Sequence, residues 1–344
     1  MTDVDTGGRD RLALAVLVQY RMATTAQMHL IISPDVRVEQ TRRRLAKLRE
    51  EGLVDRITLP HAGRTRVWHP TQYGAQIASE WPELRGRRPP RGATDRTAVR
   101  LKVRHGLTVT ETALAFLKDA RHRGDICQPL DWIPEVHHPL GGGEAVIPDA
   151  LLYYQRRPAD GVNRTTGTDD ADGTDGAEGT KGGVMLRAFI EVDRATMGPE
   201  RLAAKLGNYA RLHSYTPAPV TRQRQQPFPE PIQETWRQRY PLFPRLLFIL
   251  DGTGPTGGEN RIHALRAAAH GHELAAFLRE VPVLTTSMTD LLHHGPDHHH
   301  GQGRGRDPTR HCADPPAATR TPTTAPTTAG QRRTQTLRSR RARE

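Results

Sequence analysis

Cysteine and long apolar segments are both scarce in this 344-residue sequence. The two cysteines, Cys127 and Cys312, lie far apart in segments of different composition, which argues against a disulfide framework and a thiolate metal site. The longest apolar run near the N-terminus, Leu12 to Val18, is too short to cross a bilayer, and acidic residues precede it where a signal peptide is basic. We therefore expect a protein of the reducing cytoplasm with no membrane role.

Lysine is also rare, whereas arginine is abundant. Of the 50 Lys and Arg residues only five are Lys, and the formal net charge is +12. The isoelectric point is about 10.3. Such an excess of positive charge favours a polyanionic partner, and nucleic acid is the first candidate. A basic surface that meets only water is the alternative.

The N-terminal segment has the pattern of three helices and a hairpin. Residues 9–31 show apolar spacing typical of two helices, separated by threonines that can cap the second. A basic amphipathic helix follows and ends at Gly52, because glycine commonly stops a helix. Two β-prone runs, residues 54–59 and 66–69, then flank a turn that contains Gly63. This order resembles a winged helix-turn-helix domain.

The resemblance to the winged helix-turn-helix family covers residues 9–81 and implies binding to double-stranded DNA. In that family the third helix enters the major groove and the hairpin touches the backbone. The side chains predicted to contact phosphates or bases are Arg42, Arg43, Arg44, Lys47, Arg64 and Arg66. The alternative for the basic helix is a charged face that only contacts solvent.

A second domain is predicted after a Pro- and Arg-rich linker at residues 82–98. It covers residues 99–292. Its expected fold class is α/β, and that of the chain as a whole is α+β. The elements expected are a helix at 105–120, strands at 131–138, 145–154 and 185–193, a helix at 199–213, a strand at 245–250, a helix at 261–279 and an apolar run at 281–285. An insertion at 157–184 and a basic tail at 293–344 have too little apolar content to fold and are predicted to be disordered.

The stretch from Leu186 to Lys205 carries the strongest chemical signal. Alternation along its strand places Glu191 and Asp193 on one face, and the helix that follows holds the lysine. Asp149 follows a proline on the preceding strand. The order αβββαβ with these residues resembles the restriction-endonuclease-like PD-(D/E)xK superfamily, although position 193 is Asp where that superfamily usually has Lys.

The nuclease resemblance implies catalytic roles for Asp149, Glu191, Asp193 and Lys205. Asp149 and Glu191 would hold Mg²⁺ through hard oxygen ligands, and Lys205 would orient the attacking water or neutralise developing charge. The alternatives are ordinary ones: Asp149 as a turn residue, the strand-end acids as salt-bridge partners, and Lys205 as a solvated helical residue.

Two further residues of the helix at 105–120 are candidates. Glu111 matches a position where many nuclease-like proteins place an auxiliary acid. His105 is the alternative, as a side chain that supports the other acids.

A closer resemblance rests on the strand end EVDRAT at 191–196 and on LAAKLGNY at 202–209. These are similar to the EvDrxT-like strand end and L-x-x-K-L-x-x-Y helix of the replication-relaxation proteins of actinobacterial plasmids and integrative elements. The resemblance covers about residues 9–285. It implies a role in the replication or transfer of mobile DNA, with plasmid replication or transfer proteins as further partners, and it leaves homodimerisation open.

Two functions remain open at this point. The first is a Mg²⁺-dependent enzyme that nicks or cleaves DNA. The second is a non-catalytic DNA-binding regulator of replication or transcription, in which the nuclease-like domain serves as a scaffold.

Overall fold

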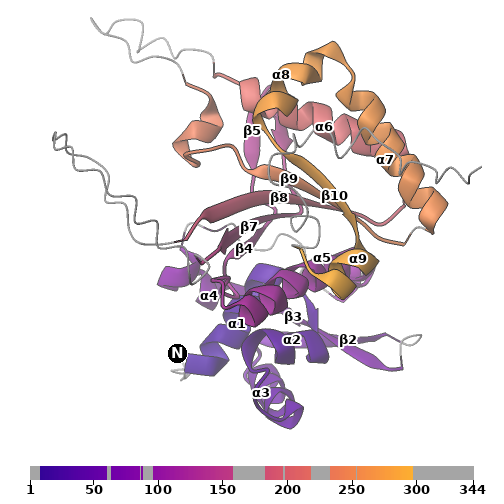
Figure 1. The fold of residues 1–344 in the computed structure, drawn as a ribbon. Coiled ribbons are helices and arrows are strands. Elements are labelled where there is room, and N and C mark those ends of the chain that lie inside the picture. The colour runs from indigo at the N-terminus through magenta and orange to yellow at the C-terminus, as the bar shows by residue number, and fades with distance from the viewer. Residues whose placement is uncertain are drawn as a thin grey trace, which may run out of the picture.

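The protein has a mixed α/β fold arranged in layers (Figure 1). The structure is a computed structural model that describes residues 8–59, 63–85, 87, 96–157, 183–196, 198–217, 233–252 and 254–296. A five-stranded sheet crosses the middle of the molecule, with α6, α7 and α8 on one side and α5, α9 and the N-terminal helices on the other. None of the described helices is long and apolar enough to cross a membrane.

The N-terminal part contains the predicted helices and the predicted pair of β-strands. Its elements are α1 (Gly8–Tyr20), β1 (Ala23–Thr24), α2 (Thr25–Ile32), α3 (Val38–Glu50), β2 (Val54–Leu59), β3 (Thr65–Pro70) and α4 (Gln72–Ser79). A capping box starts α2: the Gln27 N–H donates to Thr24 Oγ1, and the Thr24 N–H donates to Gln27 Oε1. Helix α4 was not predicted.

The remaining described elements build the large sheet and its covering helices. They are η1 (Pro82–Leu84), α5 (Arg96–Arg123), β4 (Trp132–Pro134), β5 (His138–Gly141), β6 (Glu144–Val146), β7 (Ala150–Gln155), β8 (Met185–Asp193), α6 (Pro199–Ser214), η3 (Thr235–Gln238), β9 (Arg245–Leu250), α7 (Pro255–Ala269), α8 (His272–Glu280), β10 (Val283–Ser287) and α9 (Met288–His294).

The large sheet has the strand order β10-β9-β8-β7-β4. Strands β8, β9 and β10 are parallel, whereas β7 is antiparallel to both β8 and β4. Parallel neighbours need crossover connections, which α6 supplies between β8 and β9 and which α7 and α8 supply between β9 and β10. Because side chains alternate along a strand, Phe189 and Phe248 pack with α6 and α8, whereas Ile190 and Ile249 belong to the core on the opposite face.

The N-terminal helices and that opposite sheet face share one hydrophobic core. Leu14 of α1, Trp132 of β4 and Leu291 of α9 belong to the same cluster of buried side chains. Polar contacts join the same parts, since the Tyr20 hydroxyl donates a 2.8 Å hydrogen bond to the carbonyl of Pro129. The N-terminal part is therefore packed against the sheet.

Helix α5 begins at Arg96, inside the predicted linker, and not at residue 105. The cause is tertiary packing: Val99 and Val103 form a small core with Ile57 and Val67 of the β2–β3 hairpin. Burial of this kind stabilises helical turns that composition alone does not favour.

Four other predicted segments differ from the structure. The strands at 131–138 and 145–154 are each divided, and the glycine-containing turn joins the short strands β5 and β6. Pro148 lies in the break between β6 and β7, where proline lacks the N–H that a ladder needs. In the break between β4 and β5, Glu135 has φ 52°, a left-handed conformation that strands do not adopt. The helix at 261–279 is divided between α7 and α8 at His270 and Gly271. Helix α9 continues to His294, into the predicted tail. Residues 158–182 of the insertion and 297–344 of the tail lie outside the described residues.

Candidate functional site: a carboxylate cluster and a basic hollow

Four acidic side chains lie at one edge of the large sheet. Asp149 directly precedes β7, Glu191 and Asp193 are in the last part of β8, and Asp251 directly follows β9. The carboxyl ends of β8 and β9 meet at this edge because the two strands are parallel. Ligands of open α/β sheets commonly bind at such an edge.

Asp149 and Glu191 are neighbours across the β7–β8 ladder, as predicted. Ala150 pairs with Ile190 in the antiparallel register, which places the next residue of each strand opposite the other. Asp149 Oδ2 accepts a 2.7 Å hydrogen bond from the N–H of Val192, and Asp149 Oδ1 lies 3.0 Å from His105 Nε2. Burial raises the pKa of Asp149, but the hydrogen bond with His105 and the charge of Lys205 outweigh it and hold that pKa below its ordinary value.

Glu191 is the most deeply buried acid of the cluster, with a relative exposure of 3%. Its Oε1 accepts a 2.6 Å hydrogen bond from the Tyr209 hydroxyl, and its Oε2 pairs with the Lys205 ammonium. Burial, reinforced by the negative charge of Asp149, raises the pKa of Glu191 to about 7 despite the opposing charge of Lys205. Burial also raises the pKa of Tyr209, so its hydroxyl remains a donor.

The other two acids are paired with arginines. Asp193 Oδ2 forms an ion pair with Arg261, whose side chain is only 8% exposed, and its Oδ1 accepts a 3.0 Å hydrogen bond from the N–H of Ala195. Asp251 Oδ2 lies 3.6 Å from Arg194 Nε and accepts a 3.2 Å hydrogen bond from the hydroxyl of Thr108. Each acid of the cluster therefore has a basic partner.

The predicted metal ligands are already satisfied by protein groups. All four carboxylate oxygens of Asp149 and Glu191 have partners, which are His105, Val192, Tyr209 and Lys205. Within the described ranges, no three His, Cys, Asp or Glu side chains are grouped as a metal site requires. Because Mg²⁺ needs near-octahedral oxygen coordination, this arrangement of donors does not fit it. Magnesium stays a prediction from sequence.

The structure places Glu111 away from these contacts and brings His105 into them. Glu111 Oε2 accepts a 2.7 Å hydrogen bond from Gln27 of α2. The two residues are six positions apart on α5, which turns them to different sides of the helix at about 100° per residue. His105 holds Asp149, and the hydrogen bond with Asp149 raises the pKa of His105. The alternative role of His105, support for the acids, is the one that the geometry matches.

Sequence reasoning missed Tyr209, Arg261 and Thr108 as partners of the acids. A signal existed for Tyr209, since it lies four residues after Lys205 and so shares its helix face. Arg261 and Thr108 come from helices far away in sequence, and nothing local connects them with the strand ends.

A second candidate site is a hollow of about 550 Å³ between α2, α3 and the β2–β3 hairpin. Arg42 of α3 and Arg64 and Arg66 of the hairpin line it. The other lining residues are Thr24, Thr25, Ala26, Val38 and Thr65, so none of the lining residues is acidic. Arg64 has φ 60°, a left-handed backbone conformation that is uncommon for a residue with a side chain.

Three of the predicted DNA contacts, Arg42, Arg44 and Lys47, form ion pairs within the protein. Arg44 Nε lies 2.6 Å from Asp10 Oδ1, with both side chains less than a fifth exposed. Lys47 Nζ lies 3.1 Å from Asp10 Oδ2 and 3.8 Å from Glu51 Oε1. The two pairs with Asp10 attach α3 to α1. Arg42, whose Nη1 lies 2.9 Å from Glu39 Oε1, and Arg43 are exposed on the helix.

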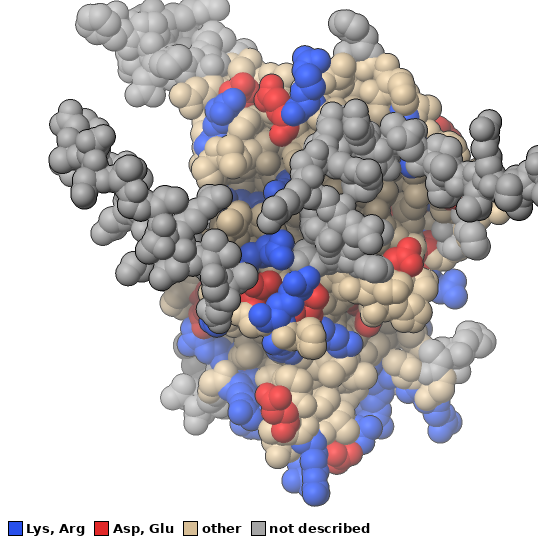
Figure 2. All heavy atoms as spheres, in the orientation of Figure 1, with Lys and Arg blue, Asp and Glu red and all other residues tan. Residues whose placement is uncertain are grey.

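Basic side chains are frequent on the lower part of the visible surface (Figure 2). Figure 2 shows Lys and Arg side chains spread over the lower part of the molecule, with fewer acidic side chains among them. Figure 1 places α3 and the β2–β3 hairpin in that part.

The fold and the two candidate sites define a mixed α/β protein with an arginine-lined hollow and a buried, charge-balanced carboxylate cluster. The chain belongs to the replication-relaxation family, whose model matches residues 14–223. This match includes the hollow, the carboxylates of β7 and β8, and α6 with Lys205 and Tyr209. The family resemblance inferred from the EVDRAT strand end and the LAAKLGNY helix is thereby confirmed.

Other comparisons add little. A solved structure of a mutant of Lactococcus lactis ZitR is similar at 20% sequence identity, with a TM-score of 0.21; the alignment covers 23% of this chain and 53% of that chain. The chain therefore spans about half the length of that relative. A likeness with so low a TM-score supports no conclusion about the fold. No curated protein matches the chain.

Proposed function

We propose that this protein binds duplex DNA and acts in the replication or relaxation of a plasmid or another mobile element. Membership of the replication-relaxation family supports the role. The arginine-lined hollow supports DNA as the ligand, because Arg side chains donate hydrogen bonds to the phosphate oxygens of the DNA backbone.

The N-terminal part acts as a winged helix-turn-helix in this proposal. Helix α3 lies in the major groove with Arg42 and Arg43 near the bases or phosphates, and the β2–β3 hairpin contacts the flanking backbone through Arg64 and Arg66. Arg44 is removed from the set of direct contacts, since its side chain is mostly buried against Asp10. Lys47 is half-exposed and stays in the set.

The single observation that carries the proposal is the shape and charge of the hollow. It brings Arg42 of α3 together with Arg64 and Arg66 of the hairpin. The three positive charges therefore line one concave surface. The left-handed conformation of Arg64 at the hairpin turn is a cost that a functional constraint would explain.

The large sheet is proposed to be a nuclease-like scaffold without catalysis. The order of α5, β4, β7, β8, α6 and β9 and the adjacency of Asp149 and Glu191 support the likeness to the PD-(D/E)xK fold. The partners of both carboxylates support a structural role, because His105, Lys205 and Tyr209 already satisfy their charge and hydrogen bonds. Metal-dependent nicking of DNA is the second candidate, and the adjacency of the two acids is the observation that favours it.

DNA binding is tested by fluorescence anisotropy of a labelled duplex at several salt concentrations. The double variant Arg64→Gln/Arg66→Gln should bind more weakly, and the slope of log affinity against log salt should fall by about two, since each phosphate contact contributes about 0.9. Arg211→Gln is the matched control, because Arg211 is exposed on α6 and pairs with Glu144. An affinity that is absent, insensitive to salt or equal in all three proteins would contradict the proposal.

Catalysis is tested with supercoiled plasmid and Mg²⁺ or Mn²⁺. The parent protein should leave the plasmid supercoiled while retarding it on the gel. Relaxed or linear product from the parent, but not from Asp149→Ala or Glu191→Ala, would replace the scaffold proposal with the nuclease.

A further inference from the structure

Strand β10 forms one edge of the large sheet. Its inner side pairs with β9, and the N–H of Leu246 donates a 2.9 Å hydrogen bond to the carbonyl of Pro282. In a parallel strand the N–H and C=O of one residue point to the same side, and this side alternates along the strand. Pro282 faces β9, so the backbone groups of Val283 and Thr285 point away from the sheet.

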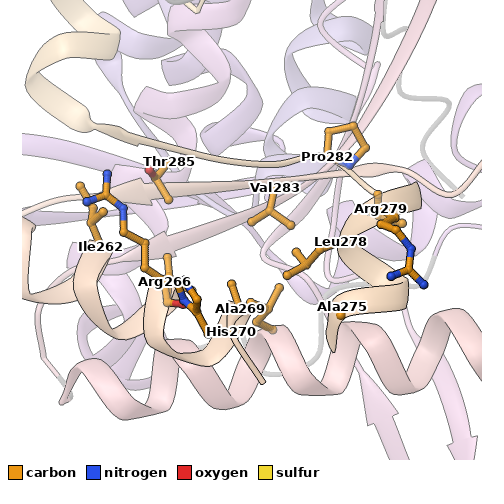
Figure 3. A pocket seen from close by; sticks show the side chains of 13 residues that line it. Ile262, Arg266, Ala269, His270, Ala275, Leu278, Arg279, Pro282, Val283 and Thr285 are labelled. Atoms are coloured by element: carbon orange, nitrogen blue, oxygen red, sulfur yellow. The ribbon is translucent and has the colours of Figure 1, made fainter. Parts of the chain in front are cut away.

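A hollow of about 320 Å³ lies next to this strand, lined by residues of α6, α7, α8 and β10. Figure 3 shows Val283 pointing from the strand toward Leu278 and Ala269 of the two helices. The side chains that line the hollow are mostly apolar, and the five residues of β10 are all partly exposed. A strand added to β10 would place alternate side chains over this apolar floor.

The charges around the hollow are basic. Arg266 of α7 and Arg279 of α8 lie at opposite ends of it, and His270 lies between them along the helices (Figure 3). A two-fold pairing of β10 with β10 of a second copy would bring Arg266 of one copy toward Arg279 of the other. Like charges disfavour that pairing, whereas acidic side chains beside the apolar ones would complement it.

We propose that β10 and the hollow bind an extended segment of a partner protein, whose side chains on the α7–α8 face are apolar in the middle and acidic at both ends. The segment adds to the sheet as a sixth strand next to Val283 and Thr285. Main-chain hydrogen bonds supply affinity in this mode of recognition, and pockets for alternate side chains supply specificity. Here the apolar side chains fill the hollow and the acidic ones face Arg266 and Arg279.

The probe is a short synthetic peptide in which every second residue, and so every residue on one face of the strand, is in turn Glu, Val, Val and Glu, with Thr between them. A peptide with Lys in place of both Glu residues serves for comparison. Binding to the full-length protein is followed by fluorescence anisotropy. The variant Thr285→Pro removes an N–H that points away from β9, so it should leave the sheet intact while blocking strand addition. Thr285→Val keeps the N–H and is the matched control.

The expected result has three parts. The acidic peptide binds the parent and Thr285→Val within about twofold of one another, it binds Thr285→Pro at least about tenfold more weakly, and the basic peptide binds the parent at least about tenfold more weakly. Circular dichroism and the DNA affinity of Thr285→Pro show whether that variant is folded.

A second variant keeps the test decisive if Thr285→Pro does not fold. Ala269→Glu puts a negative charge into the floor of the hollow without touching β10, and it should weaken the acidic peptide by a similar factor. Equal binding of the acidic peptide to the parent and both variants overturns the proposal, as does the absence of binding to the parent. Sedimentation that shows a dimer of the parent, dissociated by Thr285→Pro, also overturns it, because a second copy would then be the occupant.

Discussion

The hydroxyl of Tyr209 donates a 2.6 Å hydrogen bond to Oε1 of Glu191, and both side chains are buried under the same helix. A carboxylate removed from water requires hydrogen-bond donors. For Glu191 these are the Tyr209 hydroxyl and the ammonium of Lys205, which lies four positions earlier on the same helix. The hydrogen bond therefore joins the centre of the sheet to α6.

Tyr209→Phe should lower the free energy of unfolding by about 1.5–3 kcal/mol, since it removes a hydrogen bond to a buried charged group and keeps the ring. Urea denaturation measures the change. Tyr73→Phe is the control, because Tyr73 is 46% exposed on α4. An equal effect of both substitutions would show that Glu191 does not depend on the hydroxyl.

Glu191→Gln should change how stability depends on pH. The folded pKa of Glu191, about 7, lies above its ordinary value of 4.5, so the folded state holds the proton more tightly. The contribution of Glu191 to stability is then full below pH 4.5 and is lost as the pH rises through 7, by an amount on the order of 2–3 kcal/mol.

The measurement for Glu191 compares urea unfolding of the parent and of Glu191→Gln at several pH values between about 4.5 and 7.5. Burial lowers the pKa of His138 to about 4, which acts in the opposite sense, but His138 is present in both proteins and cancels in the difference. A difference in stability that does not vary with pH would mean that Glu191 titrates near its ordinary value.

Arg43 and Arg44 are neighbours in sequence and should respond differently to substitution by Gln. Arg44→Gln breaks the partly buried pair with Asp10 and should cost about 1–2 kcal/mol of stability, with little direct effect on DNA affinity. Arg43→Gln should leave stability within about 0.5 kcal/mol of the parent and weaken DNA binding, because Arg43 is exposed. Urea unfolding and DNA anisotropy of both variants check the pair; identical behaviour would contradict the assignment.

Two helical glycines offer a test of packing. A Cβ atom at Gly74 would lie 2.0 Å from the carbonyl oxygen of Leu53, whereas a Cβ at Gly207 meets no atom within 4 Å. Gly74→Ala should therefore cost about 1–3 kcal/mol through overpacking. Gly207→Ala should gain about 0.5–1 kcal/mol, because alanine favours the helix more than glycine does. Thermal unfolding of both variants measures the two opposite signs.

Local patterns in the sequence predict much of this fold. Strand β8 and α6 lie where alternation and the proline at position 199 placed them, and the order of strands brings Asp149 beside Glu191. Threonine before α2 predicted its cap. These features depend on neighbours in sequence or on a regular ladder.

The partners of the charged side chains could not be predicted in the same way. Asp10 of α1 forms an ion pair with Arg44 of α3, and Gln27 of α2 donates a hydrogen bond to Glu111 of α5. Likewise, α5 begins early because the hairpin offers Val99 and Val103 an apolar surface. Each of these outcomes depends on which helices pack together, and a single sequence read locally does not contain that information.

The core shared by α1 and α9 has a consequence for synthesis of the protein. Leu14 leaves the ribosome well before Met288 and Leu291, which belong to the same core and emerge after nearly the whole described fold has been made. Helix α5, which packs directly against α9, cannot complete its packing until then. The nascent chain thus exposes the side of α5 that faces α9 until the C-terminal part of the described fold has been made.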